Sequence, residues 1–201
     1  MTTRYEYLES IVPLAGDALV VATGGTIREW SALRPSDGNF KPRTLGLVSS
    51  IALGVALGLP HRKVLALDGD GAFLMNLCGL PTIAWQNPPN LIHLLFDNQC
   101  HEAAGGGVTA TSTVADPVAL AKAAGYPHAC WARNLEELRQ EFAAAWKRNE
   151  LSLIAAKVDV GRPKKLPPLP YDEIENKYRF MRHIEAGEKR PIVEPPRQAL
   201  E

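Results

Sequence analysis

Three short polar segments each follow an apolar run, and they carry the side chains best suited to chemistry. The segments are Gly24-Gly25-Thr26, Gly69-Asp70-Gly71 and Asp97-Asn98. Asp70 offers a carboxylate and Asn98 offers a side-chain carbonyl, and both are hard oxygen ligands that suit Mg²⁺. Because one carboxylate and one amide make a sparse shell, an ion held here would need further oxygens from a bound phosphate. Neighbouring glycines would let the backbone approach that anion closely.

The spacing of these groups carries more weight than any one of them. A lone Gly-Asp-Gly is explained as well by a turn as by a ligand site. Here it follows the apolar run 63–68, and 26 residues (72–97) separate it from Asn98, which follows the apolar run 91–96. A Gly-x-Gly-x-x-Gly dinucleotide fingerprint would be the competing pattern, and residues 22–30 (ATGGTIREW) lack it. The spacing therefore favours a site for a metal and a diphosphate.

Apolar runs and capping patterns predict the elements that position these segments. Strands are expected at residues 18–22, 63–68, 91–96 and 151–158. Helices are expected at 26–33, 49–59, 73–85 with a restart at Pro81, from Asp116-Pro117 onward, and 134–148, and loops at 34–43 and 97–114. Continuous apolar strands that alternate with helices predict an α/β fold, a three-layer doubly wound and mostly parallel sheet. In such a sheet the carboxyl ends of the strands meet at one edge, where helix N-termini favour anions.

The composition changes at residue 161. Residues 1–160 contain the alternating pattern and are expected to form one domain. Residues 161–201 are charged and rich in proline, with few apolar side chains, so they cannot build a core of their own. We expect an extended, proline-rich C-terminal arm that lies on another surface, and a disordered tail is the alternative.

Overall composition narrows the classes of partner. Of 201 residues, 22 are basic and 22 are acidic, so no net field would draw the chain to nucleic acid or to a membrane surface. The three cysteines, Cys78, Cys100 and Cys130, are widely spaced, which argues against a disulfide scaffold or a zinc site and for a reducing cytosol. Residues 1–8 lack the apolar core of a signal peptide, and the longest apolar stretch, 50–59, is too short to span a bilayer. We therefore expect a cytoplasmic protein with no nucleic-acid or membrane partner.

Longer stretches of sequence carry a family resemblance. Residues 64–99 (VLALDGDGAFLMNLCGLPTIAWQNPPNLIHLLFDNQ), 20–30 (VVATGGTIREW) and 121–126 (AKAAGY) resemble thiamine-diphosphate-dependent 2-oxo acid decarboxylases. The resemblance is to the beta, diphosphate-binding subunit of sulfopyruvate decarboxylase and to the C-terminal part of phosphonopyruvate decarboxylase. It extends over residues 8–160 and implies thiamine diphosphate and Mg²⁺ as cofactors.

The resemblance also implies the site residues. In the family, three groups bind the metal: the motif aspartate, the motif asparagine and a main-chain carbonyl two residues after the asparagine. In this sequence these groups belong to Asp70, Asn98 and Cys100. Leu45 is implied to support the bent cofactor, and an ordinary core position is the alternative. The implied cofactor-binding residues are Gly25, Thr26, Thr44, Leu45, Gly69, Gly71, Ala72, Phe73 and Asn98.

Two further residues follow the expected metal loop and are the candidates for catalysis. His101 and Glu102 could face the substrate there. An imidazole titrates near neutral pH, so His101 could transfer a proton; a solvated loop histidine is the alternative.

Four positions depart from the family pattern near the expected substrate. Arg43 replaces a glycine, Leu47 a histidine, His101 a tyrosine and Gly107 a glutamine. The cofactor-binding residues are kept while the substrate loops differ, so the resemblance leaves the substrate open within the 2-oxo acids.

The resemblance further implies a partner. In the family, the glutamate that activates the cofactor comes from a separate pyrimidine-binding domain, and the sequence predicts only one α/β domain. We therefore expect a split enzyme with an alpha subunit, as an α2β2 heterotetramer or a multiple of it. Three alternatives stay open: a carboligase or lyase for a less anionic substrate, a non-catalytic regulatory subunit that binds the cofactor, and a flavodoxin-like small-molecule binder.

Overall fold

A six-stranded sheet, parallel throughout, forms the centre of the computed structural model, which describes residues 2–161, 163 and 165–192. The strand order is β2-β1-β3-β4-β6-β5. Every residue of β1 and β4 is buried, which explains the continuous apolar runs, because helices cover both faces. The strands are β1 Leu19–Ala22, β2 Asn39–Phe40, β3 Val64–Gly69, β4 Leu91–Asp97, β5 His128–Ala132 and β6 Ser152–Lys157.

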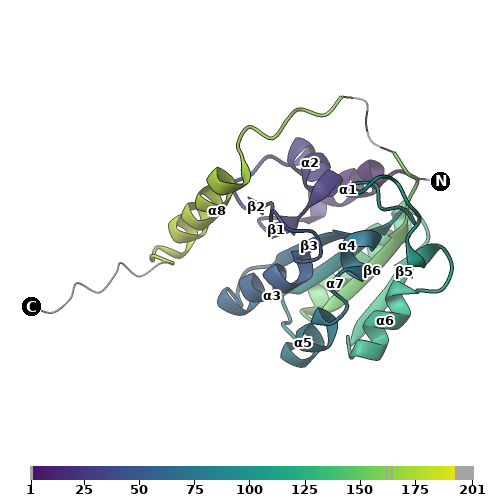
Figure 1. Ribbon diagram of the computed structural model, residues 1–201. Coiled ribbons are helices and arrows are strands. Elements are labelled where there is room, and N and C mark those ends of the chain that lie inside the picture. Colours follow the sequence, from purple (N-terminus) through teal and green to yellow (C-terminus); the bar gives the residue numbers. More distant parts are fainter. Residues whose placement is uncertain (1, 162, 164, 193–201) are drawn as a thin grey trace, which may run out of the picture.

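Helices form the two outer layers (Figure 1). Apolar side chains of α1, α2 and α7 pack on one face of the sheet, and those of α3, α4, α5 and α6 pack on the other. This arrangement confirms the predicted three-layer, doubly wound α/β fold. The helices are α1 Arg4–Ile11, α2 Gly24–Leu33, α3 Val48–Gly58, α4 Asp70–Leu74, α5 Gly79–Gln86, α6 Pro117–Ala124, α7 Leu135–Arg148 and α8 Glu173–Glu188.

Local capping signals set several helix boundaries. Asp116 accepts hydrogen bonds from the first turn of α6, and Asn134 accepts one from the Glu137 amide in α7, as their sequences predict. The predicted helical segment 73–85, expected to restart at Pro81, forms two short helices, α4 and α5, and the second begins at Gly79. Pro81 lies in the first turn of α5, where the missing amide hydrogen removes no helical bond.

Three elements of this domain were absent from the sequence-based prediction. Helix α1 begins at a capping box between Thr3 and Glu6. The short strand β2 lies inside the expected loop 34–43. Strand β5 was missed because His128, Cys130 and Trp131 are only partly buried, so the strand has no continuous apolar run.

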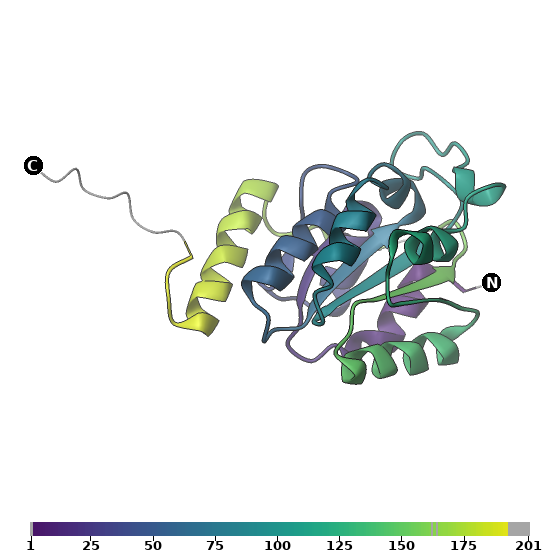
Figure 2. The same ribbon diagram turned by 90° about the horizontal axis from the view of Figure 1, so that it is seen from below.

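The segment after residue 160 also differs from the extended arm that its prolines suggested. Residues Glu173–Glu188 form α8, which lies beside α3 (Figure 2), and its Phe180 and Ile184 join a small core cluster with Leu19 and Leu59. The helix therefore adds to the domain core, although the segment has no core of its own. The part of the predicted arm at residues 193–201 lies outside the described residues.

A side chain of α8 also completes one edge of the sheet. The Asn176 carbonyl oxygen accepts a hydrogen bond from the Lys41 amide at 2.7 Å, and its Nδ2 donates to the Asn39 carbonyl at 2.9 Å. The side-chain amide thus pairs with the backbone on either side of Phe40 in β2, as a neighbouring strand would.

Among the described residues, no helix combines the length and the apolar character that a membrane crossing requires.

Candidate functional site

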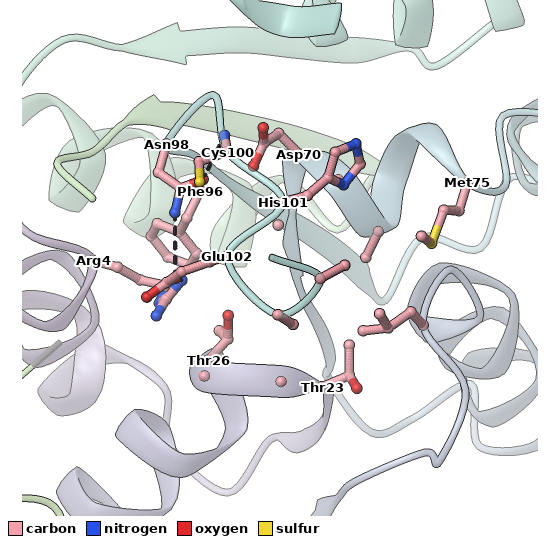
Figure 3. A pocket seen from close by; sticks show the side chains of 18 residues that line it. Arg4, Thr23, Thr26, Asp70, Met75, Phe96, Asn98, Cys100, His101 and Glu102 are labelled. Atoms are coloured by element: carbon pink, nitrogen blue, oxygen red, sulfur yellow. Dashed lines mark hydrogen bonds and ion pairs between the residues drawn. The ribbon is translucent and has the colours of Figure 1, made fainter. Parts of the chain in front are cut away.

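A pocket opens at the carboxyl ends of β1, β3 and β4, the edge where ligands bind in open parallel sheets (Figure 3). It collects predicted residues from segments that are far apart in the sequence. Two predicted residues do not line it: Thr44 is exposed, and the Phe73 side chain is buried against His93 in the core. The predicted residues that line it are Gly25, Thr26, Leu45, Gly69, Asp70, Gly71, Ala72, Asn98, Cys100, His101 and Glu102.

Asp70 begins α4 and is almost fully buried. One carboxylate oxygen, Oδ2, accepts hydrogen bonds from Thr109 Oγ1 at 2.5 Å and from Thr111 Oγ1 at 3.3 Å, which leaves Oδ1 outside both bonds. Burial raises the pKa of this carboxyl, the nearby Asp97 raises it further, and the threonine hydroxyls oppose the shift. The protein therefore stabilises the ionised form poorly, and a bound cation would supply the missing positive charge.

The two other predicted metal ligands flank a strained turn. Gln99 has φ of +58°, in the left-handed region that non-glycine residues rarely adopt. This reversal lets both Asn98 and Cys100 line the pocket, and the Asn98 carbonyl oxygen accepts a hydrogen bond from the Cys100 amide at 3.1 Å. The Thr109 amide donates to the Gln99 carbonyl at 3.1 Å, and the Gln99 side chain donates to the Thr111 carbonyl at 3.3 Å. These bonds hold the turn in the strained conformation.

A second buried carboxylate, that of Asp97, bonds the backbone of the turn at Gln99. Its Oδ1 accepts hydrogen bonds from the Gln99 amide at 3.0 Å and from Thr111 Oγ1 at 2.7 Å, and its Oδ2 pairs with Lys157 Nζ at 2.5 Å. Thr111 therefore bonds both Asp97 and Asp70. This network fixes the orientation of the Asp70 carboxylate relative to the turn.

An arginine from the first helix reaches the same pocket. Arg4 makes two hydrogen bonds of 2.8 Å to Glu29, and both residues are buried. Its Nη1 also lies 3.4 Å from Glu102 Oε2, which accepts a hydrogen bond from Asn98 Nδ2 at 3.3 Å (Figure 3). Because the side-chain nitrogen of Asn98 bonds Glu102, its side-chain oxygen points away from Glu102.

The start of α2 provides the features of an anion site. No side chain caps its first turn, which Gly24 enters with φ of +60°, and Thr23, Gly24, Gly25 and Thr26 all line the pocket. Free amide hydrogens and the helix dipole favour a negatively charged group there. Oxygen-bearing side chains and an uncapped helix start thus lie in one pocket, an arrangement that suits a cation together with an anionic group.

The imidazole of His101 lies over the first turn of α4. A methyl group added at Gly71 would lie only 2.6 Å from His101 Nδ1, so glycine is needed for this approach. The predicted catalytic histidine thus lies beside Gly71, one of the residues predicted to bind the cofactor.

Several residues of the site were missed from the sequence. Arg4, Met75 and Phe96 line the pocket, and Thr109 and Thr111 bond Asp70 from behind. The Thr-x-x-Glu capping box at residues 3–6 could have revealed α1, and so the element that carries Arg4. No local pattern identifies the threonines, because their partner lies 39 and 41 residues away.

Comparison with known proteins relates the chain to one family. Residues 39–156 match the family described as thiamine pyrophosphate enzyme, C-terminal TPP binding domain. The chain is 36% identical to phosphonopyruvate decarboxylase of Streptomyces viridochromogenes, over 94% of this chain but 49% of that protein. It is 32% identical to sulfopyruvate decarboxylase subunit beta of Methanocaldococcus jannaschii, over 90% of this chain and 96% of the relative. It thus spans about half of the first relative and nearly all of the second.

Solved structures support the same fold. Benzoylformate decarboxylase from Polynucleobacter necessarius superposes with a TM-score of 0.67 at 21% sequence identity, over 83% of this chain and 34% of that chain. A 4-hydroxybenzoylformate decarboxylase from Rhodococcus jostii RHA1 superposes with a TM-score of 0.65 at 20% identity, over 79% of this chain and 33% of that chain.

Proposed function

This chain belongs to the thiamine pyrophosphate enzymes, as a C-terminal TPP binding domain, and from this premise we propose that its pocket binds Mg²⁺ together with the diphosphate of thiamine diphosphate. One observation carries the proposal. Asp70, Asn98 and Cys100, predicted as metal ligands from sequence, line one pocket with the uncapped start of α2. Membership of this family also excludes the alternative that the chain is a flavodoxin-like small-molecule binder.

Each part of the pocket has a role in this proposal. Asp70 Oδ1, Asn98 Oδ1 and the Cys100 carbonyl would hold the metal, with further oxygen ligands supplied by the diphosphate. Leu45, on the loop before α3, lines the pocket and would face the organic part of the cofactor, whereas its neighbour Thr44 is exposed outside the pocket. Backbone groups at the starts of α2 and α4 hold the diphosphate, namely those of Gly25, Thr26, Gly69, Gly71, Ala72 and Phe73.

We propose decarboxylation of a small 2-oxo acid as the reaction, in line with the names of both relatives. When bound, thiamine diphosphate would supply the electron-accepting ring system that decarboxylation of a 2-oxo acid requires. The protein side chains hold the metal, orient the cofactor and exclude water. His101 carries the proton transfer, since its imidazole lies in the pocket and histidine is the commonest general acid and base in enzymes.

The contacts of Glu102 favour a role different from the catalytic one expected from sequence. Its carboxylate bonds Arg4 and Asn98, so it orients a metal ligand. Second-shell partners of this kind commonly fix a ligand's orientation. We therefore assign Glu102 as a positioning residue for Asn98.

We also propose that the chain works with an alpha subunit that carries the pyrimidine-binding domain and the activating glutamate. The described part of the chain contains a single sheet, and its relative of matching length is named a beta subunit. An α2β2 assembly or a multiple of it is the expected form. We expect it in the cytoplasm, because the three cysteines are all free.

Reconstitution tests the proposal. The chain is co-expressed with the product of the neighbouring gene, and a panel of 2-oxo acids is screened for carbon dioxide release with thiamine diphosphate and Mg²⁺. Activity is expected only in the complex, and Asp70→Ala should abolish it. Full activity of the chain alone would refute the split enzyme.

The same complex separates the remaining alternatives. New carbon–carbon bonds formed with an added aldehyde would indicate a carboligase. A complex in which Asp70→Ala keeps full activity would indicate a regulatory subunit whose cofactor does no chemistry.

A further inference from the structure

A second cluster of ligand-type side chains lies beside strand β5. His128 and Cys130 are two residues apart on this strand, so both project from the same face, the face that α7 covers. Glu141 projects from α7 toward them. His128 begins β5, so the cluster lies toward the amino ends of the parallel strands, and the pocket described above lies at their carboxyl ends.

The three ligand atoms are close enough to share one ion. His128 Nε2, Cys130 Sγ and a Glu141 carboxylate oxygen all lie within 4.8 Å of one another. His128 Nε2 lies 3.3 Å from Glu141 Oε2, yet this buried nitrogen makes no hydrogen bond there. A polar atom that is buried without a hydrogen bond is costly, and a metal ion between the two groups would give this nitrogen a partner.

The chemistry of the set selects the metal. An imidazole, a thiolate and a carboxylate together suit Zn²⁺, which accepts nitrogen, sulfur and oxygen ligands in tetrahedral geometry. Mg²⁺ prefers oxygen ligands alone, so the magnesium expected in the pocket would not compete here.

We propose that His128, Cys130 and Glu141 bind one Zn²⁺ ion, with water as the fourth ligand, and that this ion fastens β5 to α7. β5 is an edge strand that pairs only with β6, so its outer side has no backbone partner in the described residues. The ion would link this edge to the helix layer.

Sequence spacing argued against a zinc site because it searches for ligand pairs such as CxxC. Here two ligands alternate along a strand, and the third comes from the next helix, eleven residues after Cys130. Only the packing of α7 on β5 brings them together.

Cobalt and zinc titrations of the full chain, purified without a histidine tag and stripped of metal, test the proposal. One equivalent of Co²⁺ should give a thiolate-to-metal charge-transfer band with the intense visible bands of tetrahedral cobalt, and Zn²⁺ should displace it. A hundredfold excess of Zn²⁺ over its Kd should raise the melting temperature by roughly 5–10 °C.

Variants assign the ligands. Cys130→Ser should abolish the band, and Glu141→Gln should weaken zinc binding by at least about 100-fold, beyond the usual effect of an outer-shell change. Glu141 is partly exposed, so its variant should fold normally. Cys78→Ser, at an exposed cysteine, and Asp70→Asn, in the pocket, are matched controls that should keep the band. A band that survives Cys130→Ser, or a zinc affinity that Glu141→Gln leaves unchanged, would refute the site.

Discussion

The buried pair of Arg4 and Glu29 should support both the fold and the metal site, and variants can separate the two effects. Arg4→Met keeps most of the side-chain volume and removes the charge. It leaves Glu29 fully buried without its two 2.8 Å partners. Breaking a buried ion pair in this way costs about 3–5 kcal/mol. For a chain of this size, that corresponds to a fall in melting temperature of roughly 6–20 °C.

The metal site should respond by a different route. Without Arg4, Glu102 loses the cation at 3.4 Å, and so its hold on Asn98 Nδ2 weakens. Because outer-shell partners of metal ligands typically contribute 10–100-fold to affinity, Mg²⁺ binding at saturating thiamine diphosphate should weaken by about that factor.

A double variant distinguishes these effects. Arg4→Met combined with Glu29→Leu replaces the pair by apolar groups, and such replacements are often neutral for stability. Thermal melts should therefore recover, while calorimetric titration with Mg²⁺ should still show the weakened affinity. Recovery of both quantities would refute the positioning role of Arg4, and a melting temperature unchanged in Arg4→Met would refute the buried pair itself.

Three further outcomes are expected. Asp70→Asn should abolish Mg²⁺-dependent binding of thiamine diphosphate, yet in EDTA it should raise the melting temperature by roughly 2–4 °C, equivalent to about 1 kcal/mol. The sign follows from the raised pKa of Asp70: folding disfavours its ionised form, so the cost is absent below the unfolded pKa and grows as the pH rises through the folded pKa. The advantage of the variant should thus be larger at pH 8 than at pH 4, and an equal difference at both would contradict it. His101→Ala should lower kcat in the reconstituted complex without weakening cofactor affinity, and an unchanged rate would remove His101 from the mechanism. Phe180→Ala should cost about 2–4 kcal/mol in urea unfolding because this side chain anchors α8; a loss below about 0.5 kcal/mol would mean that α8 is not docked.

The parts of the fold predicted well are those in which one local signal dominates. Strands β1, β3, β4 and β6 have apolar runs because helices cover both of their faces. Asp70 and Asn98 could be placed in one pocket because each follows such a strand, and the strand ends of a parallel sheet share an edge.

The parts missed depend on partners that are distant in the sequence. The hydrogen bonds of Asp70 span 39 and 41 residues, and the contact of Arg4 with Glu102 spans 98. Helix α8 did offer a local signal, since Asp172 caps it and Phe180 and Ile184 are four residues apart on one face. The surrounding prolines and charges obscured that signal.

The amide of Asn176 has a consequence for how copies of this chain behave toward one another. A strand at the end of a sheet is a template for another chain, and β2 would otherwise be one. Asn176 already occupies the two backbone groups on either side of Phe40. Helix α8 therefore protects the edge strand β2 from pairing with a strand of another copy. A chain cut at residue 160 would keep every predicted ligand of the pocket and yet be open to aggregation along β2.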